Sequence, residues 1–140
     1  MLTKIQKFIL FFVNDEMWAT PLTSGNQFVS CDNIVPLPDV AKEVVGLMYG
    51  SGHIVTILDT AGLLSIRTHS KQYETCLLFN YENDHYGLLV DAGGDTVKVK
   101  RILTDRSKNR TEFKKYIKFK NKKVYILYPE DIWKKIGIYD

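Results

Sequence analysis

The amino-acid sequence predicts an all-β fold with a few short helical pieces. Runs of β-branched and aromatic residues alternate with short polar turns along most of the chain, which is the pattern of antiparallel strands. Helical periodicity is scarce. The chain has 140 residues, of which 45% are hydrophobic and 25% are charged. These values suit one globular domain with a substantial core and argue against wholesale disorder.

Four hairpins are expected in chain order. The first joins KFILFFV to MWAT through residues 14–16, and the second is the stretch VVGLMYGSGHIVTILD at residues 44–59. The third joins CLLFNY to HYGLLVD through residues 82–84, and the last joins YIKFK to KVYILY through residues 121–122. Each connection contains the polar or glycine residues that tight turns favour.

A short helix is predicted at the C-terminal end, in PEDIWKKIG. Pro129 suits the first turn of a helix, and Glu130 and Asp131 stand where the helix dipole favours acidic side chains.

The glycine cluster Gly50-Ser51-Gly52 is interpreted as a hairpin turn and not as a phosphate-binding loop. A P-loop needs Gly-Lys-Ser/Thr after four intervening residues, and a dinucleotide fingerprint needs a helix after its glycines. Here a β-branched strand follows. Ser51 also lacks the surroundings of a nucleophile elbow.

The hairpins form an internal repeat. LFFVNDEMWA resembles LFNYENDHYG, and HIVTILDTAGLL parallels KVYILYPEDIW. Two copies of one β unit predict two small barrels or sandwiches side by side in a single domain, residues 1–140. Their boundary is expected at about 70–75, with strand exchange between the units allowed.

No catalytic or metal site is predicted. His53, His69 and His85 share no close spacing with one another or with Cys31 and Cys76, whereas metal sites have characteristic ligand spacing. The expected protein is therefore not an enzyme, and we predict neither a metal nor a cofactor.

Two aspartates, Asp59 and Asp91, each end an apolar strand. Paired carboxylates could serve acid–base chemistry. Strand-end aspartates more often accept hydrogen bonds from the backbone of the next turn, which is the favoured interpretation.

Charge is distributed unevenly. Residues 1–97 carry 5 basic and 11 acidic side chains, residues 98–123 carry 12 and 2, and residues 124–140 carry 2 and 3. The basic block gives the alternative function, a nucleic-acid-binding β-barrel that uses segment 98–123.

The lysines of the basic block alternate with apolar residues. Lys118, Lys120 and Lys122 alternate with Ile117 and Phe119, the period of a half-buried strand. The aromatic ring should then lie on the face opposite the lysines, where it cannot stack bases beside them. A solvated edge protected by lysine fits this pattern, and no nucleic acid is expected as a partner.

Composition also indicates the compartment. The apolar run from Phe8 to Val13 is too short to span a bilayer, and no signal-peptide cleavage site follows it. With two cysteines in no metal-type spacing, a reduced, cytoplasmic protein without membrane insertion is expected.

Four stretches in order resemble the CheW-like family of chemotaxis coupling domains: VPLPDVAKEVVG, GLMYGSGHIVTILD, HYGLLVDAGGDTVKV and VYILYPEDIW. The resemblance implies two five-stranded, SH3-like β-barrels side by side and a short C-terminal helix. It implies a non-catalytic adaptor that couples the cytoplasmic tip of methyl-accepting chemoreceptors to the regulatory domain of a CheA-type histidine kinase.

The resemblance also gives the candidate interface. It implies contact through residues of the second hairpin and of the matching strand end: Val45, Gly46, Ser51, Gly52, Val90 and Asp91. For Val45 and Val90, each taken alone, simple burial in the core explains an apolar strand residue at least as well. The family usually has Asn-Leu-Arg-Gly at the turn, and its arginine serves assembly. This chain has Ser51 at that position, and serine lacks the planar bidentate donor of arginine.

Overall fold

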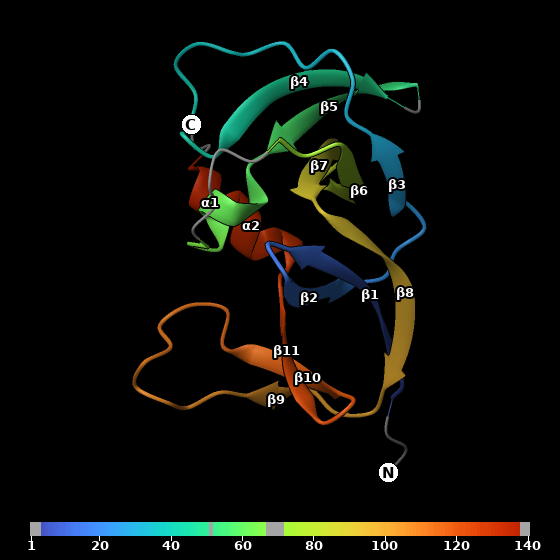
Figure 1. The fold of residues 1–140 in the computed structure, drawn as a ribbon, viewed down its shortest axis with the longest axis vertical. Helices are drawn as coiled ribbons and strands as arrows, with labels where there is room; N and C mark the ends of the chain where they lie inside the picture. The colour runs from blue at the N-terminus through green and yellow to red at the C-terminus, as the bar shows by residue number, and fades with distance from the viewer. Residues whose placement is uncertain (1–3, 51, 67–71, 138–140) are drawn as a thin grey trace.

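The computed structural model describes residues 4–50, 52–66 and 72–137 (Figure 1). Ser51, His69 and part of the expected boundary at 70–75 lie outside these ranges. The elements are β1 (Gln6–Val13), β2 (Glu16–Pro21), β3 (Gln27–Ser30), β4 (Val44–Gly50), β5 (His53–Leu58), α1 (Thr60–Leu63), β6 (Thr75–Tyr81), β7 (Asp84–Val90), β8 (Ala92–Val99), β9 (Leu103–Thr104), β10 (Lys115–Phe119), β11 (Lys122–Ile126) and α2 (Pro129–Ile136).

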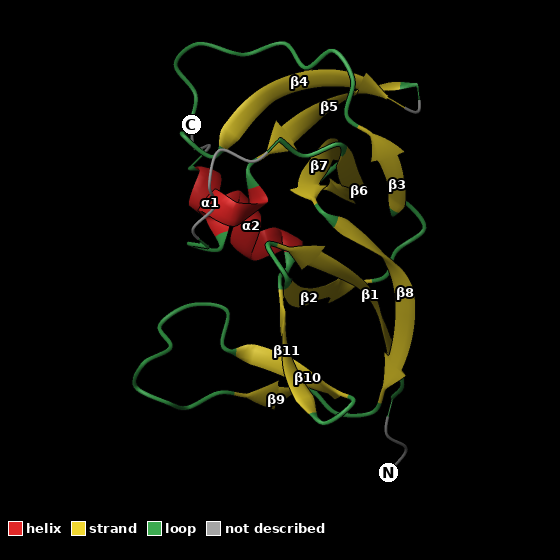
Figure 2. Ribbon diagram, viewed as in Figure 1, coloured by secondary structure: helices red, strands yellow, loops and turns green. Residues whose placement is uncertain are grey.

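The prediction of an all-β fold with short helices is confirmed. Figure 2 shows the strands in two groups with both helices beside them. One sheet has the order β8-β1-β2-β11-β10-β9, and the other has the order β3-β6-β7-β5-β4. The two expected β units are present as a six-stranded and a five-stranded sheet, and the pairings among the described strands do not close either sheet into a barrel.

Three of the hairpins have two-residue turns of one kind. Residues 14–15, 82–83 and 120–121 all have positive φ, as in a type I′ turn, whose twist matches that of the flanking strands. Asparagine occurs in each turn because it tolerates this conformation. The last turn begins one residue earlier than predicted, since Lys122 already belongs to β11.

The internal repeat is confirmed by the strand pairing. β11 lies parallel to β2, with Tyr125 opposite Trp18, and β5 lies parallel to β7, with Ile57 opposite Gly87. In both sheets the parallel strand is followed by a helix. A division of the chain at 70–75 does not separate the sheets, because β1 and β2 share a sheet with β8 to β11.

The main core combines residues of both sheets and both helices. β1 contributes Phe11, which is fully buried, and β7 contributes Leu88. Helix α1 contributes Leu63 and α2 contributes Ile132. Two smaller cores lie within the six-stranded and the five-stranded sheet regions. The shared core makes the stability of each sheet depend on the other.

Helix α2 confirms the C-terminal prediction. Pro129 begins the helix, and Glu130 and Asp131 occupy its first turn. It ends at Gly137, whose φ of 66° is the left-handed conformation that glycine adopts without a steric cost. Ile132 faces the core.

Candidate protein interface

The structure divides the predicted interface residues between two ends of the five-stranded sheet. Val45 and Gly46 lie in the first half of β4, whereas Gly52 lies in the turn between β4 and β5. Val90 and Asp91 lie at the C-terminal end of β7, which runs parallel to β5. Gly52 is therefore at the opposite end of the sheet from the other four.

Val90 and Val45 differ in how deeply their side chains are buried. Val90 is fully buried in the main core, so it belongs to the core and not to a contact surface. Val45 is half-buried against the core of the five-stranded sheet. A charged substitution at either position would disturb folding as well as binding.

The two strand-end aspartates hold turns, as the favoured interpretation predicted. Asp59 caps α1 and accepts a hydrogen bond from the Gly62 backbone nitrogen at 3.2 Å. The Asp91 carboxylate accepts a 2.5 Å hydrogen bond from the Asn14 backbone nitrogen, and the Asp91 nitrogen donates to the Phe12 carbonyl at 2.8 Å. Asp91 therefore ties the end of β7 to the first hairpin.

Gly46 is required by the close approach of the preceding chain. A Cβ atom at this position would lie 2.3 Å from the Val35 carbonyl oxygen, and the register of β4 and β5 shifts beside it. Gly46→Ala is expected to lower the free energy of unfolding by roughly 1–3 kcal/mol, because a backbone atom must move. Gly50→Ala is the matched control, since its Cβ would meet only the flexible end of Met48 at 3.3 Å. Urea unfolding measures both, and equal effects would contradict this assignment.

An apolar surface that the sequence analysis missed lies on the outer face of β4 and β5. Tyr49 and Ile54 are opposite each other and are 76% and 66% exposed. Leu47 precedes them on the same face, and Val35, which is 62% exposed, pairs with Leu47. These four residues, Val35, Leu47, Tyr49 and Ile54, are called the outer patch below. Strand alternation in GLMYG and HIVTI could have revealed it, because residues two apart share a face.

The first residue of β5 contacts β7 through a pair of histidines. The rings of His53 and His85 stack with their centroids 3.9 Å apart and an interplanar angle of 17°. Nδ1 of His85 lies 2.8 Å from Oδ1 of Asn80. Nearly parallel rings hold their nitrogen lone pairs parallel, so the pair does not converge on one metal ion. Their proximity arises from the parallel pairing of β5 and β7, which sequence spacing does not show.

The basic face of β10 and β11 differs from the prediction in two respects. Phe119 packs against the core of the six-stranded sheet, but Lys122 is its cross-strand partner and Nζ of Lys120 lies 5.2 Å from the centre of its ring, so these two lysines are not on the opposite face. Second, Tyr116 pairs with Tyr125, and Lys118 pairs with Lys123, in the alternate registers that share the other face. Two tyrosines therefore lie beside the lysines, and the expected separation of aromatic rings from lysines is wrong for this pair.

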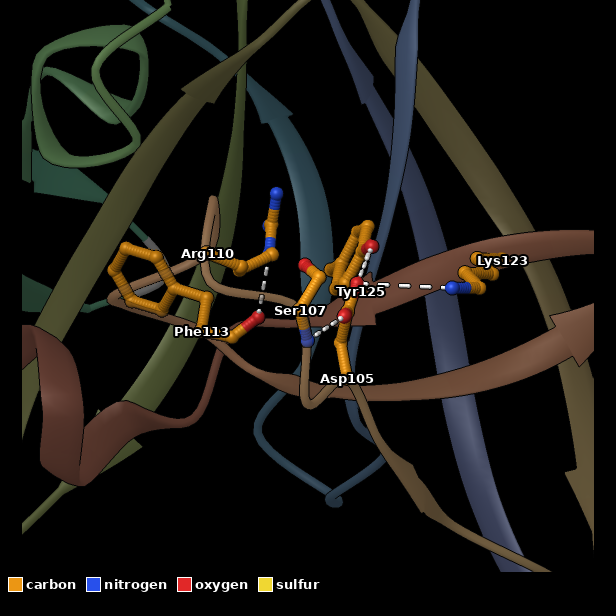
Figure 3. Close-up of polar contacts among 6 residues, drawn as sticks. All are labelled: Asp105, Ser107, Arg110, Phe113, Lys123 and Tyr125. Atoms are coloured by element: carbon orange, nitrogen blue, oxygen red, sulfur yellow. Dashed lines mark hydrogen bonds and ion pairs between the residues drawn. The ribbon is translucent and has the colours of Figure 1, made fainter.

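Cations cover these aromatic rings. The guanidinium carbon of Arg110 lies 3.4 Å from the centre of the Tyr125 ring and 5.6 Å from that of Trp18. Nε of Arg110 donates to the Phe113 carbonyl at 3.1 Å (Figure 3). The Phe113 ring meets Trp18 edge to face at 5.8 Å. These contacts hold the loop between β9 and β10 against the sheet.

Asp105 anchors the other end of this loop. Its carboxylate accepts hydrogen bonds from the Tyr125 hydroxyl at 2.5 Å and from the Ser107 nitrogen at 2.9 Å, and Lys123 lies 3.7 Å away (Figure 3). Hydrogen bonds hold the pKa of Asp105 well below its usual range, and the bond from the Tyr125 hydroxyl contributes most, followed by the bonds from Ser107. The same hydrogen bond to Asp105 raises the pKa of Tyr125.

Stability should therefore decline at both ends of the pH range because of this pair. The contribution of Asp105 is complete above its unfolded pKa of about 3.9 and is lost as pH falls through the lowered folded value. The contribution of Tyr125 is complete below about pH 10 and is lost as pH rises through the raised folded value. Tyr125→Phe should destabilise the protein between these limits, with a difference from wild type that shrinks beyond either limit. Urea unfolding of both proteins at a series of pH values measures this difference in the free energy of unfolding. Tyr116→Phe is the control. A difference between Tyr125→Phe and wild type that does not change with pH would contradict the prediction.

The described residues offer little for catalysis or metal binding. They contain no group of three or more His, Cys, Asp or Glu side chains placed to hold an ion. Burial raises the pKa of the Cys76 thiol to about 12, so it is not a thiolate nucleophile near neutral pH. Among the helices of the described ranges, none is long and apolar enough to cross a bilayer.

Comparison with known proteins agrees with this arrangement. The family model of the CheW-like domain matches residues 7–135. The crystal structure of the scaffolding protein TtCheW from Thermoanaerobacter tengcongensis superposes with a TM-score of 0.75, covering 88% of each chain at 17% sequence identity. None of the curated protein sequences matches the chain. Because the family model spans nearly the whole sequence, the chain belongs to the CheW-like domain family.

Proposed function

We propose that this chain is a cytoplasmic, non-catalytic adaptor of chemotaxis-type signal transduction. In this proposal it binds the regulatory domain of a CheA-type histidine kinase, which shares the fold. Membership of the CheW-like family supports the class of function. The absence of a metal-binding group among the described residues is compatible with an adaptor.

The outer patch is the observation that carries the proposal. Tyr49, Ile54 and Val35 are each more than half exposed, although apolar side chains of this size gain free energy by leaving water. A contiguous exposed apolar surface on a folded domain marks an interaction site. The exposed side chains of the outer patch are therefore available to the surface of another domain.

The chemistry of the outer patch specifies the kind of contact. None of its four residues is charged, so the partner should offer an apolar surface of matching shape. A contact of this kind depends weakly on salt, whereas contacts between exposed charges weaken as salt screens them. Salt dependence therefore separates docking through the outer patch from docking through the basic segment 98–123.

The direct test is a titration of the chain with the purified regulatory domain of a CheA-type kinase from the same cell. We expect a complex whose dissociation constant changes little between low and physiological salt. Failure to bind any such regulatory domain would remove the proposed function and leave the fold assignment intact.

For the chemoreceptor, we propose a contact that is weaker than the contact with the kinase domain. This chain has Ser51 where the family has an arginine, and a serine hydroxyl cannot replace a charged, bidentate donor. We therefore expect a weaker contact with the receptor tip than with the kinase domain.

A further inference from the structure

Arg110 is held on the sheet and is only partly buried. One face of the guanidinium stacks on Tyr125 at 3.4 Å, and Nε donates to the Phe113 carbonyl. In Figure 3 the end of the Arg110 side chain extends beyond its hydrogen bond to Phe113, and among the described residues Nε is the only guanidinium nitrogen with a hydrogen bond. A guanidinium fixed by stacking and by one hydrogen bond loses little side-chain entropy when its remaining N–H groups bind an anion.

The neighbouring carboxylates already have other partners. Asp105 accepts from Tyr125 and Ser107 and lies near Lys123. Glu112 pairs with Lys135 of α2 at 3.1 Å. Within the described residues, Arg110 has no ion pair with either carboxylate. Its positive charge is therefore available to a group from outside the chain.

The surroundings of Arg110 are strongly basic. Segment 98–123 carries 12 basic and 2 acidic residues, and the acidic ones are Asp105 and Glu112. Both are paired inside the fold, as described above. The remaining positive charge gives this side of the six-stranded sheet a potential that attracts a polyanion.

We propose that Arg110 is the carboxylate-binding residue of a second interaction surface, which takes an acidic segment of a partner protein. A planar guanidinium matches the two oxygens of a carboxylate in a bidentate pair. The surrounding lysines add attraction to neighbouring acidic side chains and accelerate the encounter.

An acidic protein segment fits this surface better than a nucleic acid. Single-stranded nucleic acids bind by stacking bases on exposed aromatic rings. Here Arg110 covers Tyr125, and Nζ of Lys123 lies 5.0 Å from the centre of the Tyr116 ring. Each of these two rings thus already carries one of the chain's own cations, which leaves it a poorer stacking platform for bases.

This surface is separate from the outer patch. Arg110 lies in the loop between β9 and β10 of the six-stranded sheet, whereas the outer patch lies on β4 and β5 of the other sheet. The inference therefore goes beyond the proposed function and does not depend on it. An adaptor with both surfaces could hold an apolar and an acidic partner at once.

The test uses a capped 12-residue glutamate-rich peptide as the probe and the full chain. Arg110→Gln should weaken peptide binding at least about tenfold, and Arg110→Lys about fivefold, because lysine keeps the charge but not the bidentate geometry. Arg106→Gln is the matched control: it removes the same charge from an exposed position of the same loop. It should cost less than about threefold, as expected for an exposed charge.

Four results would overturn the proposal. Equal losses for Arg106→Gln and Arg110→Gln would leave only diffuse charge attraction, and wild-type binding by Arg110→Lys would exclude the bidentate contact. Tighter binding of a random 12-nucleotide single strand than of the peptide at physiological salt would favour nucleic acid. If the variants fail to fold, the Arg110 Nε–H resonance of the wild-type chain should shift on peptide addition, and an unchanged resonance would contradict the proposal.

Discussion

Ile54→Asp is expected to weaken binding to the kinase regulatory domain at least about 100-fold, or about 2.7 kcal/mol. Ile54 belongs to the outer patch and lies opposite Tyr49, so an apolar partner would bury the new carboxylate without a counter-charge. The unbound protein should tolerate the change, because a 66% exposed position usually alters stability by no more than about 0.5 kcal/mol. Titration calorimetry and thermal unfolding measure the two effects separately.

The matched control is Ile5→Asp. Ile5 is 54% exposed and directly precedes β1 of the six-stranded sheet, so the same chemical change is made away from the outer patch. It should leave the affinity within about twofold of wild type, because a distant surface charge acts only through screened electrostatics. Equal losses in both variants would show that added negative charge, and not the outer patch, determines binding.

Phe11→Ala is expected to lower the free energy of unfolding by about 3–5 kcal/mol, because it removes a large buried ring and leaves a cavity. Phe11 is fully buried in the core that both sheets share. Domains of this size are stable by only about 5–15 kcal/mol, so the variant should be close to unfolding.

Phe12→Ala is the control for this prediction. Phe12 is adjacent in β1 and half-buried, so the same atoms are removed where water already reaches the ring. It should cost clearly less than Phe11→Ala in urea unfolding, followed by the fluorescence of Trp18, which pairs with Phe11. Comparable costs would show that the shared core does not depend on Phe11.

Local features of this fold could be predicted from the sequence because their causes are local. Strand alternation located the hairpins, asparagine-containing turns connected three of them, and Pro129 with two acidic residues located α2. The assignment of strands to sheets could not be predicted in this way. The pairing of β2 with β11 joins residues more than a hundred positions apart, and no local pattern encodes that partnership.

The candidate site was predicted less completely than the fold. Family likeness pointed to the second hairpin, where the outer patch lies, but it included Val90, whose side chain is buried. Burial depends on what the other sheet covers, so an apolar strand residue alone does not show whether it faces core or solvent. The stacking of Arg110 on Tyr125 joins a loop to a later strand. The spacing of these two residues in the sequence does not indicate this contact.

Mapping the bound surface tests the central claim most directly. We would record amide chemical shifts of the labelled chain with and without the unlabelled kinase regulatory domain. The account predicts that the largest changes occur at residues 47–49 and 53–56, around Tyr49 and Ile54, with residues 98–123 nearly unchanged. Saturable binding that shifts residues 98–123 and leaves β4 and β5 unperturbed would contradict it.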